Sequence, residues 1–166
     1  MFIPFDSLGD AARIWIYQAG RVITEAERNT ISESLSAFTE SWTAHGAPLK
    51  ASFAIFYDQF IVLAADEAFQ EASGCSIDGS VRVMNELDQK FGLDLFDRTR
   101  VVFLKDEKPV AMSMSSLPKA LEEGHWNRDT LVFNNVIGSK GELKSAWVVP
   151  TGLTWLKRYL TTVRQA

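Results

Sequence analysis

The chain contains one run of small polar residues, Ser73-Gly74-Cys75-Ser76-Ile77-Asp78-Gly79-Ser80, between an apolar strand pattern and an amphipathic helix pattern. Glycines at positions 74 and 79 allow backbone angles that other residues adopt only with strain. Ser76 or Asp78 can cap the helix that follows. Apolar residues recur there at helical spacing, namely Ile77, Val81, Met84, Leu87 and Phe91. The run therefore predicts a helix start beside the only cysteine of the chain.

A helix start next to Cys75 favours negative charge. The first N–H groups of a helix have no partner within the helix, and the helix dipole is positive at that end. An anion, or the thiolate of Cys75, would be stabilised there. The alternative is structural, because serine, glycine and aspartate are common in turns and caps, and a lone cysteine often serves as a small buried residue.

Two sets of candidate site residues follow. For catalysis, Cys75 is the candidate nucleophile and His45 its candidate base, because an unperturbed imidazole titrates near neutral pH. His45 also precedes Gly46, where a histidine at a helix end can interact with the last carbonyls. The candidate ligand-binding residues are Ser73, Gly74, Ser76, Asp78 and Ser80, with charge from Arg82 and Arg98.

Composition limits the class of protein. The 166 residues, 46% of them hydrophobic, suit a single domain over residues 1–166 with a packed core. Lys and Arg number 17 against 21 Asp and Glu, and no basic cluster stands out, so nucleic acid is not an expected partner. No segment reaches the roughly 18 apolar residues of a membrane span, and the N-terminal residues do not resemble a signal peptide. We expect a cytoplasmic protein without a membrane partner.

Cysteine and histidine are too scarce for a recognisable metal motif. One cysteine excludes an intramolecular disulfide, and two histidines, His45 and His125, lie far apart in the sequence. Gly138-Ser139-Lys140-Gly141 lacks the spacing of a nucleotide-binding loop. The sequence predicts neither a metal nor a cofactor.

The order of patterns predicts an α+β fold. Residues 12–19 indicate a central strand buried on both faces, and a capping box at residues 24–27 begins a long helix that ends near His45-Gly46. A hairpin with a turn at Asp58-Gln59, a helix to Phe91 and a further strand follow. Their ranges are 50–57, 60–65, 80–91 and 101–104. This βαββαβ order is typical of the ferredoxin-like arrangement.

The last third extends this arrangement. We expect a strand at 109–114, a short helix at 119–123, and a strand pair at 131–133 and 146–149 around the turn residues 138–141. A final helix carries a stripe of Leu153, Leu156, Leu160 and Val163, widened by Trp155 and Tyr159. The wide apolar face suggests core packing or a contact between two copies of the chain.

Four segments together resemble a family of small uncharacterised bacterial proteins that are sometimes labelled "ABC transporter ATPase". The segments are Arg13–Gln18, His45-Gly46, Ser73–Asp78 and Phe96-Asp97-Arg98. The label does not fit this sequence, which has neither a nucleotide-binding loop nor an LSGGQ-type signature. The resemblance implies a bacterial cytoplasmic protein and supplies no active site.

Three functional hypotheses remain at the level of sequence. The first is a domain that binds a small anionic ligand at residues 73–80. The second is a cysteine-dependent enzyme that uses Cys75. The third is a non-catalytic protein that forms a homodimer through its C-terminal helix or an edge strand.

Overall fold

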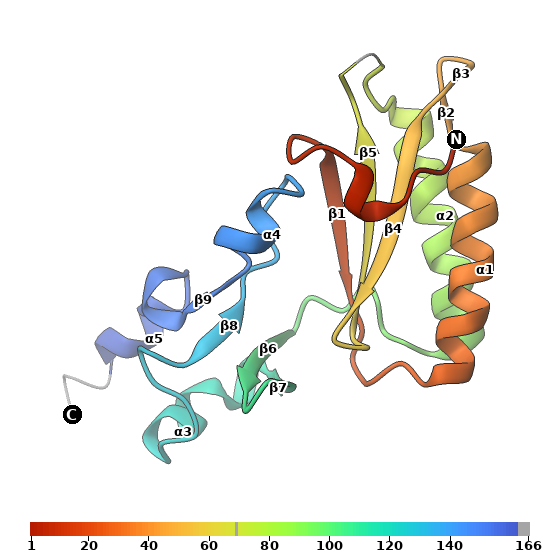
Figure 1. Cartoon of the computed structure of the whole chain (residues 1–166). Helices are drawn as coiled ribbons and strands as arrows, with labels where there is room; N and C mark the ends of the chain where they lie inside the picture. Colours follow the sequence, from red (N-terminus) through yellow and green to blue (C-terminus); the bar gives the residue numbers. More distant parts are fainter. Residues whose placement is uncertain (69, 163–166) are drawn as a thin grey trace. The chain divides into compact units, whose positions relative to one another are not determined.

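The computed structural model describes residues 1–68 and 70–162. The chain divides into two compact units, one formed by Met1–Phe96 with Gly138–Gly141, the other by Asp97–Ile137 and the residues from Glu142 onward. Both contain helices and an antiparallel sheet, so the predicted α+β class is confirmed (Figure 1). That residues 1–166 form a single domain stays a prediction.

The first unit is a sheet covered on one face by two helices. The strands are β1 (Arg13–Gln18), β4 (Lys50–Phe56) and β5 (Phe60–Asp66), and the helices are α1 (Glu25–Ser41) and α2 (Gly74–Phe91). The helices lie side by side against the sheet (Figure 1). Their shared core consists of buried residues from every layer, including Ile31, Leu35, Ile61, Leu63, Met84 and Leu87.

The central strand is β5 and not β1, as the sheet order β1-β5-β4 shows. Residues 60–65 are apolar and fully buried, which a strand flanked on both sides requires. The prediction that residues 12–19 form the central strand is therefore wrong. The outer side of β1 receives the segment 138–141, since the Ile14 N–H donates to the Gly138 carbonyl at 3.0 Å.

Lys140 fixes that segment to the start of the chain. Its side chain is buried, and Nζ donates to the carbonyl oxygens of Asp6 at 3.1 Å and Leu8 at 2.5 Å. Asp6 lies in the short 3-10 helix η1 (Phe5–Ser7). Gly138-Ser139-Lys140-Gly141 therefore serves as an anchored edge of the first sheet.

The ferredoxin-like arrangement is present only in part. β1 and β4 are both antiparallel to β5, so β5 lies between two strands that run parallel, as in a split βαβ unit. The expected fourth strand, β6 (Arg100–Lys105), instead pairs with β7 (Lys108–Ser113) and β8 (Leu131–Phe133). Asp106 and Glu107 both have positive φ, and this tight turn pairs β6 with the strand that follows it.

Helix α1 ends at Ser41, so the predicted helix end at His45-Gly46 is wrong. Trp42 has an extended backbone and a buried side chain, and a small hairpin follows, formed by β2 (Thr43–Ala44) and β3 (Ala47–Pro48). His45 and Gly46 occupy its turn with φ of 51° and 79°. Two consecutive positive φ angles are typical of a type I′ hairpin turn, in which glycine is favoured.

The second unit is built on the sheet β7-β6-β8-β9, where β9 is Val148–Pro150. Trp126 is buried in its core, stacks on Phe103 and donates its indole N–H to the Leu117 carbonyl at 2.9 Å. The remaining elements are η2 (Met114–Ser116), α3 (Leu117–Glu122), α4 (Glu142–Ser145), η3 (Thr151–Leu153) and α5 (Lys157–Thr162).

The final helix is shorter than the sequence predicted. Leu153 lies in η3 and is 78% exposed, whereas Leu156 is buried, so the two do not share one apolar stripe. Val163 lies outside the described residues. None of the described helices combines the length and the hydrophobicity needed to cross a bilayer.

The start of α1 predicts a pH dependence of stability. Glu27 accepts hydrogen bonds from the Arg21 guanidinium at 2.7 and 2.9 Å and from the Thr24 N–H at 2.9 Å, which lowers the pKa of Glu27 from 4.5 to about 2. A lowered pKa stabilises the fold above pH 4.5, and this stabilisation is lost as the pH falls through about 2.

Glu27→Gln should therefore unfold at lower urea concentration than the natural protein at pH 6, and the difference should shrink by pH 2. Glu25→Gln removes a carboxylate from the same turn but leaves this network intact, so its difference from the natural protein should stay small. An unchanged difference for Glu27→Gln across this range would contradict the assignment.

Candidate functional site

Helix α2 begins at Gly74 and is capped by Ser73, whose backbone is extended (φ −78°, ψ 166°). The Ser73 hydroxyl accepts from the Ser76 N–H, and the Ser76 hydroxyl accepts from the Ser73 N–H, both at 3.2 Å. The prediction that Ser76 or Asp78 caps the helix is wrong, because this reciprocal pair forms one turn earlier. Cys75 therefore lies within the first turn of the helix.

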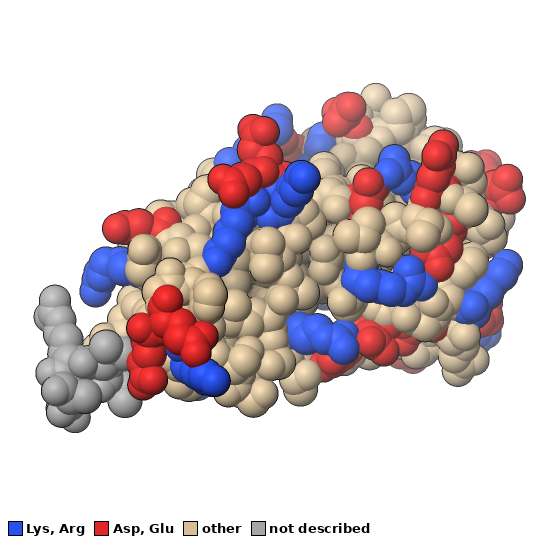
Figure 2. Space-filling model, turned by 90° about the horizontal axis from the view of Figure 1, so that it is seen from below, with Lys and Arg blue, Asp and Glu red and all other residues tan. Residues whose placement is uncertain are grey.

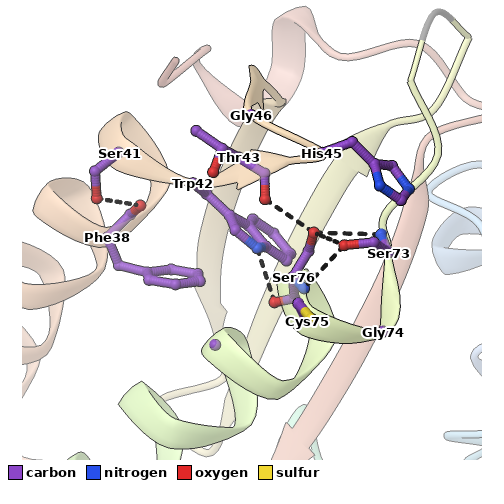
Figure 3. Close-up of a pocket in the computed structure, with 11 residues that line it drawn as sticks. Phe38, Ser41, Trp42, Thr43, His45, Gly46, Ser73, Gly74, Cys75 and Ser76 are labelled. Atoms are coloured by element: carbon purple, nitrogen blue, oxygen red, sulfur yellow. Dashed lines mark hydrogen bonds between the residues drawn. The ribbon is translucent and has the colours of Figure 1, made fainter.

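Ser76 also ties the helix to the β2–β3 hairpin. Its side chain is buried, and its hydroxyl donates to the Thr43 carbonyl at 2.8 Å. Its own carbonyl accepts the indole N–H of Trp42 at 2.9 Å, as Figure 3 shows. The end of α1, the hairpin and the first turn of α2 are thus joined at one buried residue.

This junction places His45 and Cys75 around one cavity of about 630 Å³ (Figure 3). His45 is exposed at the hairpin turn, and Cys75 is an exposed free cysteine in the first turn of α2. The remaining wall comes from the same three elements and includes Phe38, Trp42, Thr43, Ser73 and Gly74. The two candidate catalytic residues are thus brought to the same cavity.

The cavity offers fewer unpaired amides than the sequence suggested. The Ser76 N–H is taken by the cap, and the Ile77 N–H donates to the Ser73 carbonyl at 3.0 Å. Within residues 1–68 and 70–162, the N–H groups of Gly74 and Cys75 donate to no protein acceptor. Both residues are exposed and line the cavity. Two amides at the positive end of α2 therefore have no protein acceptor among the described residues.

Several predicted ligand residues lie elsewhere. Ser80 is fully buried and donates to the Ile77 carbonyl at 2.7 Å. Asp78 and Arg82 are exposed on α2, and Arg98 is exposed in the second unit. Asp78, Ser80 and Arg82 do not line the cavity of the first unit.

The sequence did not indicate the aromatic wall of the cavity. Phe38 and Trp42 continue the helical spacing of Ile31 and Leu35, which predicts only a core-facing side of a helix. The rings of Trp42 and Phe38 are tilted by 39° with centroids 4.9 Å apart, and the Trp42 indole N–H donates to the Ser76 carbonyl. A useful signal was the dipeptide His45-Gly46, because glycine at the second position of a two-residue turn indicates a hairpin.

Neither a patch of like charge in the view of Figure 2 nor a cluster of metal ligands among the described residues indicates a second site. Acidic and basic side chains are interspersed over the face seen in Figure 2. In the part of the chain that the structure describes, no three histidine, cysteine or carboxylate side chains come together as metal ligands would. That nucleic acid is not a partner stays a prediction.

Comparisons with protein families, with curated proteins and with solved structures found no match to this chain. The resemblance to small bacterial proteins therefore stays an expectation.

The cap at Ser73 can be tested against the cap that the sequence suggested. Ser73→Ala removes the acceptor of the Ser76 N–H and should lower the free energy of unfolding by about 1 kcal/mol. Asp78→Ala is the control, because Asp78 is exposed within the helix, and it should change stability by less than about 0.5 kcal/mol. Urea denaturation of both variants checks this. A larger loss for Asp78→Ala than for Ser73→Ala would contradict the capping assignment.

Proposed function

We propose that the cavity between the β2–β3 turn and the first turn of α2 binds a small anionic ligand that carries a phosphate or carboxylate group. The observation that carries this proposal is that Gly74 and Cys75, two exposed residues whose amides donate to no described protein acceptor, line one cavity together with His45. The amides and the helix dipole would hold the anion at the start of α2.

The composition of the cavity wall supports an anion over a cation. Among the described residues that line the cavity, none is an aspartate or a glutamate. His45 would add a hydrogen-bond donor, and a positive charge when protonated. Phe38 and Trp42 offer an apolar surface for the uncharged part of the ligand.

Inorganic phosphate is the simplest probe of this function. It should raise the melting temperature of the natural protein in a saturable way, because a ligand that binds only the folded state stabilises it. Gly74→Pro should weaken phosphate binding about tenfold, since it removes one of the two unpaired amides. Proline is tolerated at the first position of a helix, and the extended backbone of Ser73 suits a following proline.

Arg82→Gln is the matched control. Arg82 lies on the same helix but does not line the cavity, so its removal should change the phosphate affinity by less than twofold. Isothermal titration calorimetry at constant ionic strength measures both variants. Equal affinity for the natural protein and Gly74→Pro, or a larger loss for Arg82→Gln, would contradict the proposed site.

A cysteine-dependent activity is the second candidate. It is favoured by the exposure of Cys75 in the cavity that also contains His45. In this function the Cys75 thiolate would form a bond to the acyl carbon of a substrate held at the start of α2. The bond from that carbon to the leaving group would break, and His45 would pass the thiol proton to the leaving group. Water would then hydrolyse the thioester and free Cys75. The two functions share one cavity and differ in whether the thiol reacts.

Alkylation kinetics separate these functions. If His45 activates the thiol, His45→Gln should slow the reaction of Cys75 with iodoacetamide at pH 7 several-fold. His125→Gln is the control, because His125 is an exposed histidine of the second unit and should leave the rate unchanged. Equal rates in the natural protein and His45→Gln would contradict activation of Cys75 by His45. They would not contradict the proposed anion site.

A further inference from the structure

Gly79 lies in the second turn of α2 and also lines the cavity of the candidate site. A glycine inside a helix destabilises it relative to alanine, and it is usually explained by a positive φ or by close approach of another group. The φ of Gly79 is not positive. A Cβ at this position would lie 4 Å or more from every described atom outside its chain neighbours and the backbone of its own helix. Neither the backbone angles nor packing among the described residues therefore requires glycine here.

The missing side chain leaves part of the cavity open. Cys75 and Gly79 are four residues apart, so they lie on one face of α2, and both line the cavity. Ser76 and Ser80, the next residues in the chain, are buried in the protein. A side chain at position 79 would therefore take up space in the cavity without replacing a contact within the protein.

Helix α1 supplies an aromatic wall of the same cavity. Phe38 is partly buried, and its side chain points from α1 toward α2 (Figure 3). Trp42 is 3% exposed, and its indole N–H is bonded to the Ser76 carbonyl. Phe38 therefore offers more accessible aromatic surface to a ligand than Trp42 does.

The cavity is larger than an inorganic anion needs. Its volume of about 630 Å³ lies within the range of sites for small organic molecules, which is about 300–1,000 Å³. A single phosphate or carboxylate group at the start of α2 would fill only a small part of it. The remaining space would suit an uncharged group of the ligand.

We propose that the ligand is an aromatic compound that carries the phosphate or carboxylate group, and that its ring occupies the space beside Gly79, against Phe38. This inference rests on the proposed anion site, where the Gly74 and Cys75 amides hold the charged group. A ring that packs on another aromatic ring gains stabilisation beyond that of its buried apolar area. Gly79 is then the residue that determines which uncharged group the site accepts.

Phenyl phosphate and methyl phosphate test the aromatic ligand. At pH 8 both monoesters are dianions, so they differ only in the uncharged group. The natural protein should bind phenyl phosphate about tenfold more tightly in isothermal titration calorimetry. Equal affinities would overturn this inference but would not contradict the anion site. Failure of both monoesters and of inorganic phosphate to bind would contradict the proposed function and with it this inference.

Gly79→Leu tests the place of the ring. The leucine side chain would fill the space beside position 79, so the variant should bind phenyl phosphate no more tightly than methyl phosphate, and its methyl phosphate affinity should change by less than about twofold. Asn85→Leu is the control, because Asn85 is exposed on α2 and does not line the cavity, and it should keep the preference. A preference that survives in Gly79→Leu, or that is lost in Asn85→Leu, would overturn the proposed place of the ring.

Gly79→Ala separates a role in ligand binding from a role in the fold. Alanine favours the helix and meets open space, so it should raise the melting temperature of the unliganded protein by about 2 °C. The same variant should bind phenyl phosphate about threefold more weakly than the natural protein. A lower melting temperature would show that the fold itself requires glycine there, and this would overturn the role assigned to Gly79.

Discussion

The buried junction at Ser76 positions the candidate site. Its hydroxyl bonds the Thr43 carbonyl and its carbonyl accepts the Trp42 indole, so the first turn of α2 is attached to the hairpin that follows α1. Each such hydrogen bond contributes about 1 kcal/mol, and leaving a buried partner unpaired costs more. Because the hairpin is fixed there, its turn residue His45 lines the same cavity as Cys75.

Patterns within short segments of the sequence predicted much of the first unit. They did not predict which segments far apart in the chain pair with each other. The capping box at Thr24 and Glu27, the β4–β5 hairpin and the left-handed Gly92 at the end of α2 are each set by neighbouring residues. The pairing of β1 with residues 138–141 depends instead on contacts such as Lys140 to Asp6, which lie 134 positions apart in the chain. The pattern of residues within β6 does not predict that this strand pairs with β8 and not with β1.

The sequence also predicted only the local part of the candidate site. Ser73, Gly74 and Cys75 were expected just before a helix over residues 80–91, whereas in the structure Ser73 is the N-cap and Gly74 and Cys75 lie in the first turn of α2. This earlier start changed the expected role of Ser80, because Ser76, Ser80, Met84 and Leu87 form the buried face of α2. The proximity of His45 to the cavity could not be read from the sequence, since it depends on the Trp42 and Ser76 contact.

If the first amides of α2 and the β2–β3 turn bind an anion from solution, phosphate must change the backbone ¹H–¹⁵N signals of these residues. A phosphate titration at constant ionic strength should shift the signals of Gly74, Cys75 and His45 in a saturable way with a common dissociation constant, and it should change the signal of Arg82 little. Shifts that do not saturate, or that centre on residues away from the cavity, would contradict the proposed anion site.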